Sequence, residues 1–320
     1  MGRLINKDNL LNIISLWGFD ENVEIIEEDI SYETNRETHI WTVNEDYILK
    51  MTTKENQTVN NIFISELLSK AGIPAQKVVT RLSGESYYNM NDRYYTLFTK
   101  LKGSVLKDYY DGDYIERGFY LGQCLAELHE GLKSITDELI IHKKIWDNNM
   151  INELEGWVND EILKYIPKCG LSKDKIDKFN NIRKDINENF KNVYYKLPRQ
   201  IIHRDFHREN MIFQNEKLVG YIDFDLCQIN ARIFDLCYLC TGSLASIFDK
   251  NEMREKWISF AKSAINGYES KSDITTDEKN SIKYMMFSIE LIMVGYFAKD
   301  GYTEIANSNI EMVDWINDIW

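Results

Sequence analysis

The first hundred residues alternate between short apolar runs and polar turns. Six runs are rich in β-branched or aromatic side chains: residues 22–29, 37–44, 46–53, 76–82, 85–90 and 93–101. Runs of this length and composition predict strands, and turns such as residues 44–46 predict an antiparallel meander. Residues 57–70 differ, because their apolar side chains recur at about 3.6 residues and predict a helix that ends at Gly72-Ile73-Pro74.

After Gly103 the pattern becomes mainly helical. Residues 104–132 carry a long helical periodicity, and a short β-like stretch around residues 200–224 interrupts the helical remainder. We therefore expect an α+β protein with a boundary near residue 101. Residues 1–101 would form an antiparallel sheet with one helix, and residues 102–320 a mainly helical part.

Composition narrows the class of protein. A chain of 320 residues with 44% apolar content can bury a sizeable core. No apolar run approaches the roughly 18 residues of a membrane span, and the first residues do not resemble a signal peptide, so we expect a cytoplasmic protein. Five cysteines without a secretory signal are better explained as reduced thiols than as disulfides.

The net charge of −13 is spread over both parts of the chain. Such a field disfavours nucleic acid and anionic membranes as partners, and it attracts a cationic small molecule. The oligomeric state is left open.

The chemistry concentrates in HRDFHREN, residues 203–210. Asp205 and Asn210 are five residues apart, and Asp223 of YIDFD follows thirteen residues later, after an apolar strand-like run. A loop with Asp and Asn, followed by a hairpin that ends in Asp, can bring one carboxylate to a substrate hydroxyl. The amide oxygen and the second carboxylate then supply the hard oxygen ligands that Mg²⁺ prefers.

This arrangement resembles the aminoglycoside phosphotransferase and choline kinase superfamily, small-molecule kinases with a protein-kinase-like fold. The likeness rests on HxDxxxxN followed by IDFD, a strand lysine in YILK, a helix ending at AGIP, the segment YTLFTKLKG, and the later LGQCLAELHEGL and ARIFDLCYL. It implies a bilobal protein-kinase-like fold and transfer of phosphate from ATP, or GTP, to a small-molecule alcohol with Mg²⁺ as cofactor.

The resemblance also implies roles for single residues. Asp205 matches the catalytic base, Asn210 and Asp223 the metal ligands, and Lys50 the lysine that holds the nucleotide phosphates. Asp235 matches a carboxylate that braces the catalytic loop, and His203 is expected to hold the same loop rather than to titrate. The adenine is expected against the backbone of Thr99 and Leu101.

Two features depart from the family pattern. The family has a helix glutamate that pairs with the lysine, and Glu66 is the only acid in the central turns of helix 57–70. Counting back from AGIP, however, places the partner of Lys50 nearer Asn61 or Ile62. The phosphate-covering segment, residues 30–39, contains no glycine, so Ser31 or backbone amides would contact the phosphates.

Two other assignments compete locally. His203 and His207 could form a zinc site with Cys237 and Cys240, although both cysteines lie in an apolar helical run where thiols act as small hydrophobes. Asp225 could be a second metal ligand or a carboxylate that caps the next turn.

The acceptor is expected to meet the part of the chain after Gly103. Glu290 interrupts an apolar helical run, where an unpaired carboxylate is costly, and Asp147 is a further acidic candidate. With the acidic balance, these residues favour a cationic acceptor, first an aminoglycoside. Choline, ethanolamine, homoserine and methylthioribose are served by the same superfamily. A non-catalytic scaffold with this fold and a protein-substrate kinase are the competing classes. A protein-substrate kinase is disfavoured, because this chain has no DFG, no APE-like segment and no activation loop of useful length between Asp223 and Asp235.

Overall fold

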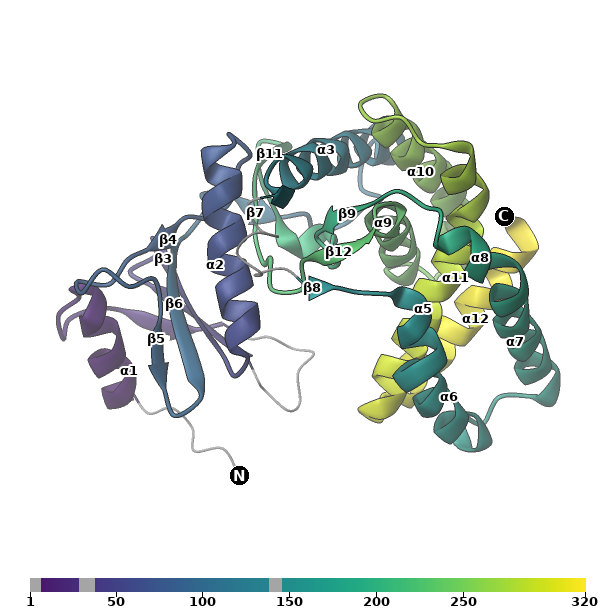
Figure 1. Cartoon of the computed structure of the whole chain (residues 1–320), viewed down its shortest axis with the longest axis horizontal. Coiled ribbons are helices and arrows are strands. Elements are labelled where there is room, and N and C mark those ends of the chain that lie inside the picture. Colours follow the sequence, from purple (N-terminus) through teal and green to yellow (C-terminus); the bar gives the residue numbers. More distant parts are fainter. Residues whose placement is uncertain (1–6, 29–37, 138–145) are drawn as a thin grey trace. The chain divides into compact units, whose positions relative to one another are not determined.

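The computed structural model describes residues 7–28, 38–137 and 146–320. The described chain divides into two compact units, drawn in Figure 1. The first contains the residues up to Leu106 together with Glu209–Cys227. The second contains Lys107–Thr136, Trp146–Arg208 and Gln228–Trp320. The segment that holds Asn210 and Asp223 therefore packs with the N-terminal unit, and the segment that holds Asp205 packs with the helical unit.

The first unit is built on an antiparallel sheet. Its elements are α1 (Lys7–Ile14), a 3-10 turn (Ser15–Trp17), β1 (Ile25–Glu27), β2 (Thr38–Val43), β3 (Tyr47–Thr52), α2 (Glu55–Lys70), β4 (Val78–Val79), β5 (Tyr88–Met90), β6 (Arg93–Thr99), β7 (Ser104–Val105), β10 (Met211–Gln214) and β11 (Lys217–Tyr221). The main sheet has the order β1-β2-β3-β6-β4, with β5 on β6, and β11-β10-β7 form a second, three-stranded sheet.

Strand alternation gives the main sheet two different faces. Leu49, Met51 and Leu97 point to one face, where they join the side chains of α1 in an apolar core that includes Ile13 and Trp17. Lys50 is paired with Thr96 across β3 and β6 and points to the other face, toward α2. Figure 1 shows the sheet between these two helices.

Tight hairpin turns connect several of the strands. Asn44-Glu45, Asn91-Asp92 and Asn215-Glu216 all have positive φ, between 47° and 62°. Two consecutive left-handed residues match the right-handed twist of the flanking strands, and asparagine tolerates this conformation better than most residues. These turns set the β2–β3, β5–β6 and β10–β11 registers.

The second unit is mainly helical. It contains α3 (Tyr114–Ser134), β8 (Trp146–Asp147), α5 (Met150–Glu153), a π turn (Leu154–Val158), α6 (Asn159–Tyr165), a 3-10 turn (Ile166–Lys168), α7 (Lys173–Asp185), a second π turn (Ile186–Phe190), α8 (Lys191–Tyr194), β9 (Arg199–Ile202), β12 (Gln228–Ala231), α9 (Ile233–Ala245), α10 (Asn251–Glu269), α11 (Thr276–Lys299) and α12 (Thr303–Ile319). β12 lies between β8 and β9 in a small mixed sheet.

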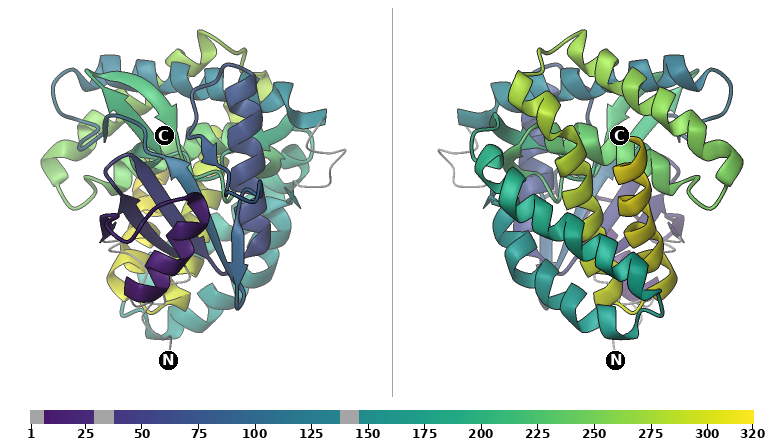
Figure 2. Two further views of the ribbon diagram at one scale, coloured as in Figure 1. Left: turned by 90° about the vertical axis from the view of Figure 1, so that its left-hand side faces the viewer. Right: turned by 90° about the vertical axis from the view of Figure 1, so that its right-hand side faces the viewer.

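Helix α11 forms the interior of this unit. It packs against α9, α12 and α6, and the right-hand view of Figure 2 shows the yellow α12 beside it. Within the described residues it is the one helix long and apolar enough to cross a membrane by composition, and two thirds of that apolar stretch, 67%, is buried inside the fold. Its apolar character is therefore that of a core helix.

The α+β class, the antiparallel N-terminal sheet and the helical remainder are confirmed. Two expectations are wrong in detail. Helix α1 was not expected, and residues 104–113 are not helical, because Gly112 takes a left-handed φ of 59° and Asp113 caps the first N–H groups of α3. The predicted boundary near residue 101 lies close to Leu106, where the first segment of the N-terminal unit ends.

Candidate active site

The end of the β10–β11 hairpin carries both predicted metal ligands. Met211 pairs with Tyr221, so Asn210 and Ile222 are the next residues along the two strands, and the Ile222 N–H donates to the Asn210 carbonyl at 3.1 Å. Asp223 follows with a left-handed φ of 64°, a strained conformation for a residue other than glycine. The hairpin register thus brings Asn210 and Asp223 to one end of the first unit.

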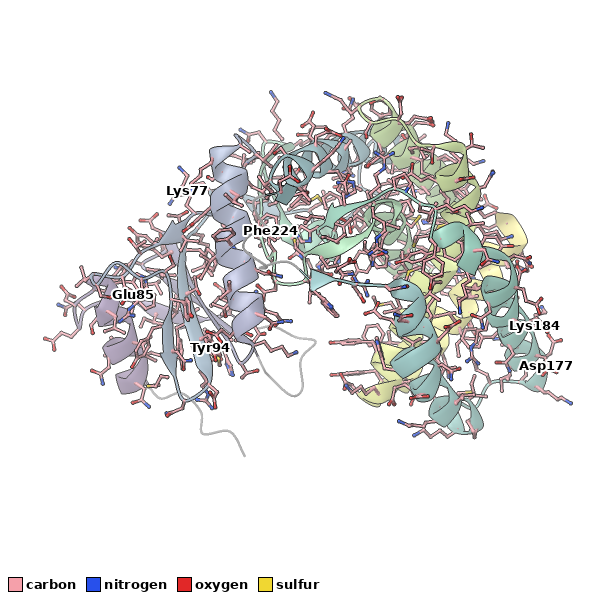
Figure 3. All side chains as sticks on the ribbon, in the orientation of Figure 1. Lys77, Glu85, Tyr94, Asp177, Lys184 and Phe224 are labelled. Atoms are coloured by element: carbon pink, nitrogen blue, oxygen red, sulfur yellow. The ribbon has the colours of Figure 1, made fainter. Side chains whose placement is uncertain are left out.

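Lys50 contacts two carboxylates of the same segment. Its Nζ lies 2.9 Å from Asp223 Oδ1 and 2.7 Å from Asp225 Oδ2. Burial acts against the charged ammonium, but the two carboxylates outweigh it and hold the pKa of Lys50 above its ordinary value. Burial, and then the neighbouring charge of Asp223, raise the pKa of the Asp225 carboxyl. Phe224, which lies between the two acids in the sequence and is labelled in Figure 3, is fully buried.

Helix α2 presents Asn61 to this cluster. Asn61 Nδ2 donates to Asp225 Oδ1 at 2.7 Å. The described contacts of Lys50 go to Asp223 and Asp225, and the structure does not bring Glu66 to it. The reason is helical geometry: Glu66 lies five residues beyond Asn61 and therefore points about 140° away around the helix. The expected pairing of Lys50 with Glu66 is thus corrected.

The predicted nucleotide contacts can be placed in part. The Thr99 N–H already donates to the Lys77 carbonyl at 2.8 Å, whereas the described chain offers no acceptor to the Leu101 N–H. Both residues stay predicted nucleobase contacts. Ser31 lies outside the described residues.

In the second unit, Asp235 braces the start of HRDFHREN. Its carboxylate accepts the backbone N–H groups of His203, at 2.7 Å, and Arg204, at 2.9 Å. Arg204 has a left-handed φ of 72°, and its guanidinium is 2.8 Å from Glu153 Oε2 and lies over the Phe234 ring. These contacts hold the backbone immediately before Asp205 in one conformation.

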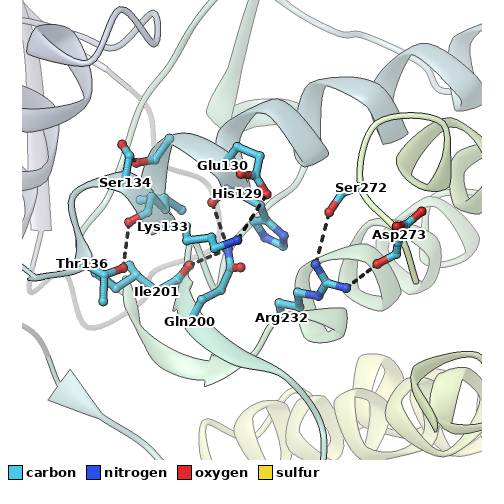
Figure 4. A network of polar contacts seen from close by, with 12 residues as sticks. His129, Glu130, Lys133, Ser134, Thr136, Gln200, Ile201, Arg232, Ser272 and Asp273 are labelled. Carbon is cyan, nitrogen blue, oxygen red and sulfur yellow. Dashed lines mark hydrogen bonds and ion pairs between the residues drawn. The ribbon is translucent and has the colours of Figure 1, made fainter. Parts of the chain in front are cut away.

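His129 on α3 supports the same carboxylate. Its Nε2 lies 3.1 Å from Asp235 Oδ2, and its Nδ1 lies 2.8 Å from the Tyr268 hydroxyl. With the Nε2 proton facing Asp235, the Tyr268 hydroxyl donates to Nδ1. Figure 4 shows the neighbouring contacts, in which Gln200 of β9 donates to the His129 carbonyl and Arg232 donates to Ser272. The strand before the loop is thus tied to α3.

Asp205 is held by two side chains. The Tyr238 hydroxyl donates to Oδ1 at 2.9 Å, and His207 Nε2 lies 3.3 Å from Oδ2. Burial alone would raise the pKa of Asp205. The hydrogen bond and charge of His207, followed by the charge of His203 and the bond from Tyr238, outweigh it and hold the pKa below its ordinary range. An ionised carboxylate with fixed orientation can accept a proton from a hydroxyl group.

The two predicted acceptor ligands lie in different surroundings. Asp147 is exposed on β8 and is paired with Arg199. Glu290 is 2% exposed within α11; burial raises its pKa well above the ordinary value, only partly opposed by a hydrogen bond from Thr241. A cation could reach Glu290 only by displacing packed side chains, so its role as an acceptor ligand stays a prediction.

Cys237 and Cys240 are buried in α9, as the apolar pattern predicts. Burial raises the pKa of the Cys240 thiol to about 12 and that of Cys237 well above its ordinary value. Over residues 7–28, 38–137 and 146–320, no group of three or more His, Cys, Asp or Glu side chains is suited to a metal ion. The geometry gives no support to a zinc site at these cysteines.

The sequence did not predict the roles of three supporting residues: Asn61, His129 and Tyr238. Tyr238 carried a usable signal, because it follows Asp235 by three residues and so shares a face of α9 with it. Counting back from AGIP located the position of Asn61, but not that an amide acts there, and His129 acts through contacts distant in sequence and had no comparable signal.

Known proteins resemble this chain in sequence and in fold. A model of the phosphotransferase enzyme family matches residues 30–275. A homoserine kinase from Zymomonas mobilis is 26% identical over 168 residues, which are 49% of this chain and 44% of that protein. The chain thus spans less than half the length of that curated relative.

Solved structures show the same fold at low identity. A microcompartment-associated aminopropanol kinase superposes with a TM-score of 0.70 at 13% identity, covering 97% of each chain. The GDP and kanamycin complex of APH(2")-IIia gives 0.68 at 15%, covering 98% of this chain and 99% of that one. Amicoumacin kinase hAmiN, with AMP-PNP and Ca²⁺, gives 0.67 at 14%, covering 97% and 93%.

Proposed function

Because this chain belongs to the phosphotransferase enzyme family, we propose that it transfers a phosphoryl group from a nucleoside triphosphate to a hydroxyl group of a small molecule. The observation that carries the proposal is Asp205. It is a carboxylate with a depressed pKa, fixed by Tyr238 and His207, on a loop whose backbone is itself braced by Asp235.

Asp205 would act on the acceptor. Its carboxylate would accept a hydrogen bond from the hydroxyl group, orient the oxygen for attack and take up its proton as the new P–O bond forms. A low pKa suits this role, because the carboxylate stays ionised across the neutral pH range. It also limits the driving force for proton transfer, so orientation is the larger part of its contribution.

The end of the β10–β11 hairpin fits a magnesium ion. Asn210 and Asp223 offer one amide oxygen and one carboxylate, and the Asp223 side chain is 35% exposed. When bound, the metal would neutralise charge on the phosphates. Lys50 would hold the phosphates that are not transferred, and the Leu101 N–H would meet the nucleobase. Ser31 remains a predicted phosphate contact. The choice between ATP and GTP is open, since the similar structures include complexes with AMP-PNP, ADP and GDP.

The proposed acceptor is an alcohol that also carries an amine, first an aminoglycoside. The net charge of −13 favours a cationic ligand. Kanamycin is bound in one similar structure, and aminopropanol and homoserine name two other similar kinases. A choline or methylthioribose type of acceptor stays an alternative. A cytoplasmic location stays a prediction. A scaffold role would leave the ordered Asp205 carboxylate without a use.

An acceptor panel tests the proposal. Purified protein with Mg-ATP or Mg-GTP would be incubated with aminoglycosides, homoserine, aminopropanol, choline and neutral sugars, and nucleoside diphosphate release measured. We expect release with at least one amine-bearing alcohol and not with its deoxy analogue. Nucleotide binding without transfer to any acceptor in the panel would favour the scaffold alternative.

A further inference from the structure

Asn61 is oriented by a set of buried contacts. Its Oδ1 accepts hydrogen bonds from Gln76 Nε2 at 3.0 Å, and more weakly from the Phe224 N–H and the Ser65 hydroxyl, both at 3.4 Å. Three donors on one side leave the amide NH₂ to face Asp225, at 2.7 Å. Asn61 is 2% exposed, so this orientation is set by packing and not by solvent.

Asp225 is correspondingly fixed on two sides. One oxygen accepts from Asn61 and the other lies 2.7 Å from Lys50 Nζ. Its side chain is 10% exposed, compared with 35% for Asp223, which is the other carboxylate on Lys50. Of the two acids, Asp223 is the one open to a further ligand and Asp225 the one closed by protein contacts.

We propose that Asp225, positioned by Asn61, is the permanent partner of Lys50 and so leaves Asp223 to the metal. The inference rests on the proposed function and deepens it by dividing the roles of the two acids of IDFD. Without Asp225, Lys50 would have Asp223 as its remaining carboxylate and would compete with a cation for it. Asp225 is therefore a positioning residue that acts through Lys50, not a metal ligand.

The identity of residue 61 follows from the same geometry. Lys50, Asn61 and Asp225 line one small void of about 10 Å³ together with the hydroxyl side chains of Thr52, Thr58 and Thr96. A carboxylate at position 61 would face the Asp225 carboxylate at hydrogen-bond distance and repel it. An amide donates to it instead. The amide of Asn61 on α2 and the carboxylate of Asp225 after β11 are thus complementary.

A double-mutant cycle tests the division of roles. The magnesium concentration that half-saturates AMP-PNP binding would be measured by calorimetry for the unmodified protein, Asp225→Asn, Lys50→Met and the double variant. We expect Asp225→Asn to raise this concentration roughly tenfold, the size usual for residues that position a metal ligand. In the Lys50→Met background the same change should have less than about a twofold effect, because the competing ammonium is gone.

The outcomes separate three explanations. An Asp225→Asn effect that persists in Lys50→Met would make Asp225 a direct metal ligand and overturn the inference. An unchanged magnesium requirement in Asp225→Asn would overturn it as well. If the unmodified protein binds neither Mg-AMP-PNP nor Mg-GTP, the proposed function itself is wrong. That result differs from the two above, in which the unmodified protein binds the nucleotide.

Asn60 supplies a matched control for Asn61. It is the neighbouring residue on α2 and donates to the Cys227 carbonyl at 3.2 Å, whereas the described contacts of Lys50 and Asp225 do not include it. Both Asn61→Leu and Asn60→Leu should lower the melting temperature, but only Asn61→Leu should raise the magnesium requirement. The exchange variant Asn61→Asp/Asp225→Asn should recover part of the binding lost in Asp225→Asn. Equal magnesium dependence in Asn60→Leu and Asn61→Leu, or an exchange variant no better than Asp225→Asn, contradicts the positioning role.

Discussion

At the scale of residues, three buried or half-buried carboxyl groups differ in what faces them. Asp205 faces His207 and Tyr238, Asp225 faces Lys50 and Asn61, and Glu290 is buried in α11 with a hydrogen bond from Thr241. The pKa of Asp205 lies below its ordinary range, because the hydrogen bond and charge of His207 outweigh burial, whereas burial raises the pKa of Asp225 and of Glu290 against the effect of their nearest partners.

The low pKa of Asp205 predicts an acid limb of the pH–rate profile that depends on His207. We expect His207→Asn to move the acid limb of kcat/KM to higher pH, because the main contact that lowers the pKa of Asp205 is lost. Tyr238→Phe should move it in the same direction by less. Profiles between pH 4.5 and 8 would show this, with Tyr195→Phe as a control, since Tyr195 is exposed and contacts Asn149 outside residues 203–210. An acid limb that shifts equally in all three variants contradicts the assignment.

Burial of Glu290 predicts that stability falls as pH rises. The folded protein keeps a proton that the unfolded chain loses near pH 4.5, so each further pH unit costs up to about 1.4 kcal/mol until the folded pKa is reached. Glu290→Gln should therefore be more stable than the unmodified protein at pH 8, with a gap that shrinks toward pH 5. Urea denaturation at several pH values measures the gap, and the exposed Glu304→Gln should show none. A stability unchanged by Glu290→Gln, with a raised KM for a cationic acceptor, would instead support the ligand role.

At the scale of elements, the strands of the main sheet could be predicted, but the side-chain contacts that join one element to another could not. Alternating β-branched runs with polar turns located all six strands of the main sheet, and the 3.6 period located α2. Helix α1 and the non-helical residues 104–113 were missed, the first because it is short and the second because Gly112 and Asp113 override the apolar pattern. Counting back from AGIP located position 61, but the contact of Asn61 with Asp225 and that of His129 with Asp235 could not be predicted, because these partners lie more than a hundred residues away in sequence.

The contact between α3 and α10 depends on glycine and yields a stability prediction. A Cβ on Gly122 would lie 2.0 Å from the Ala264 carbonyl oxygen, and one on Gly267 would lie 1.9 Å from that of Phe119. Because backbone atoms cannot give way as a side chain can, Gly122→Ala should lower the free energy of unfolding by roughly 1–3 kcal/mol.

Gly242 in α9 provides the control for this change. No atom beyond its own helix lies within 4 Å of its Cβ position, so Gly242→Ala should be neutral or stabilise by up to about 1 kcal/mol through helix propensity. Urea denaturation of both variants compares them directly. Equal effects of the two substitutions would show that packing between α3 and α10 is not as close as described.

At the scale of the whole molecule, the negative charge should favour cationic acceptors. With a net charge of −13, the KM for an aminoglycoside should rise several-fold between about 0.05 and 0.3 M NaCl, as screening shortens the Debye length. The KM for a neutral sugar alcohol, if it is a substrate, should stay unchanged over the same range. A salt-independent KM for the best acceptor would shift the proposed class to uncharged alcohols.

The most direct test of the account is the substitution Asp205→Asn, assayed for both transfer and nucleotide binding. The amide preserves the shape of the side chain, but it is uncharged and has one acceptor oxygen, so it neither orients the hydroxyl group as the carboxylate does nor takes up its proton. With the best acceptor and Mg-nucleotide, we expect kcat to fall by about a hundredfold to ten-thousandfold while the affinity for Mg-AMP-PNP stays within about threefold of the unmodified protein. A variant that keeps a near-normal kcat would contradict Asp205 as the catalytic residue and, with it, the proposed reaction site.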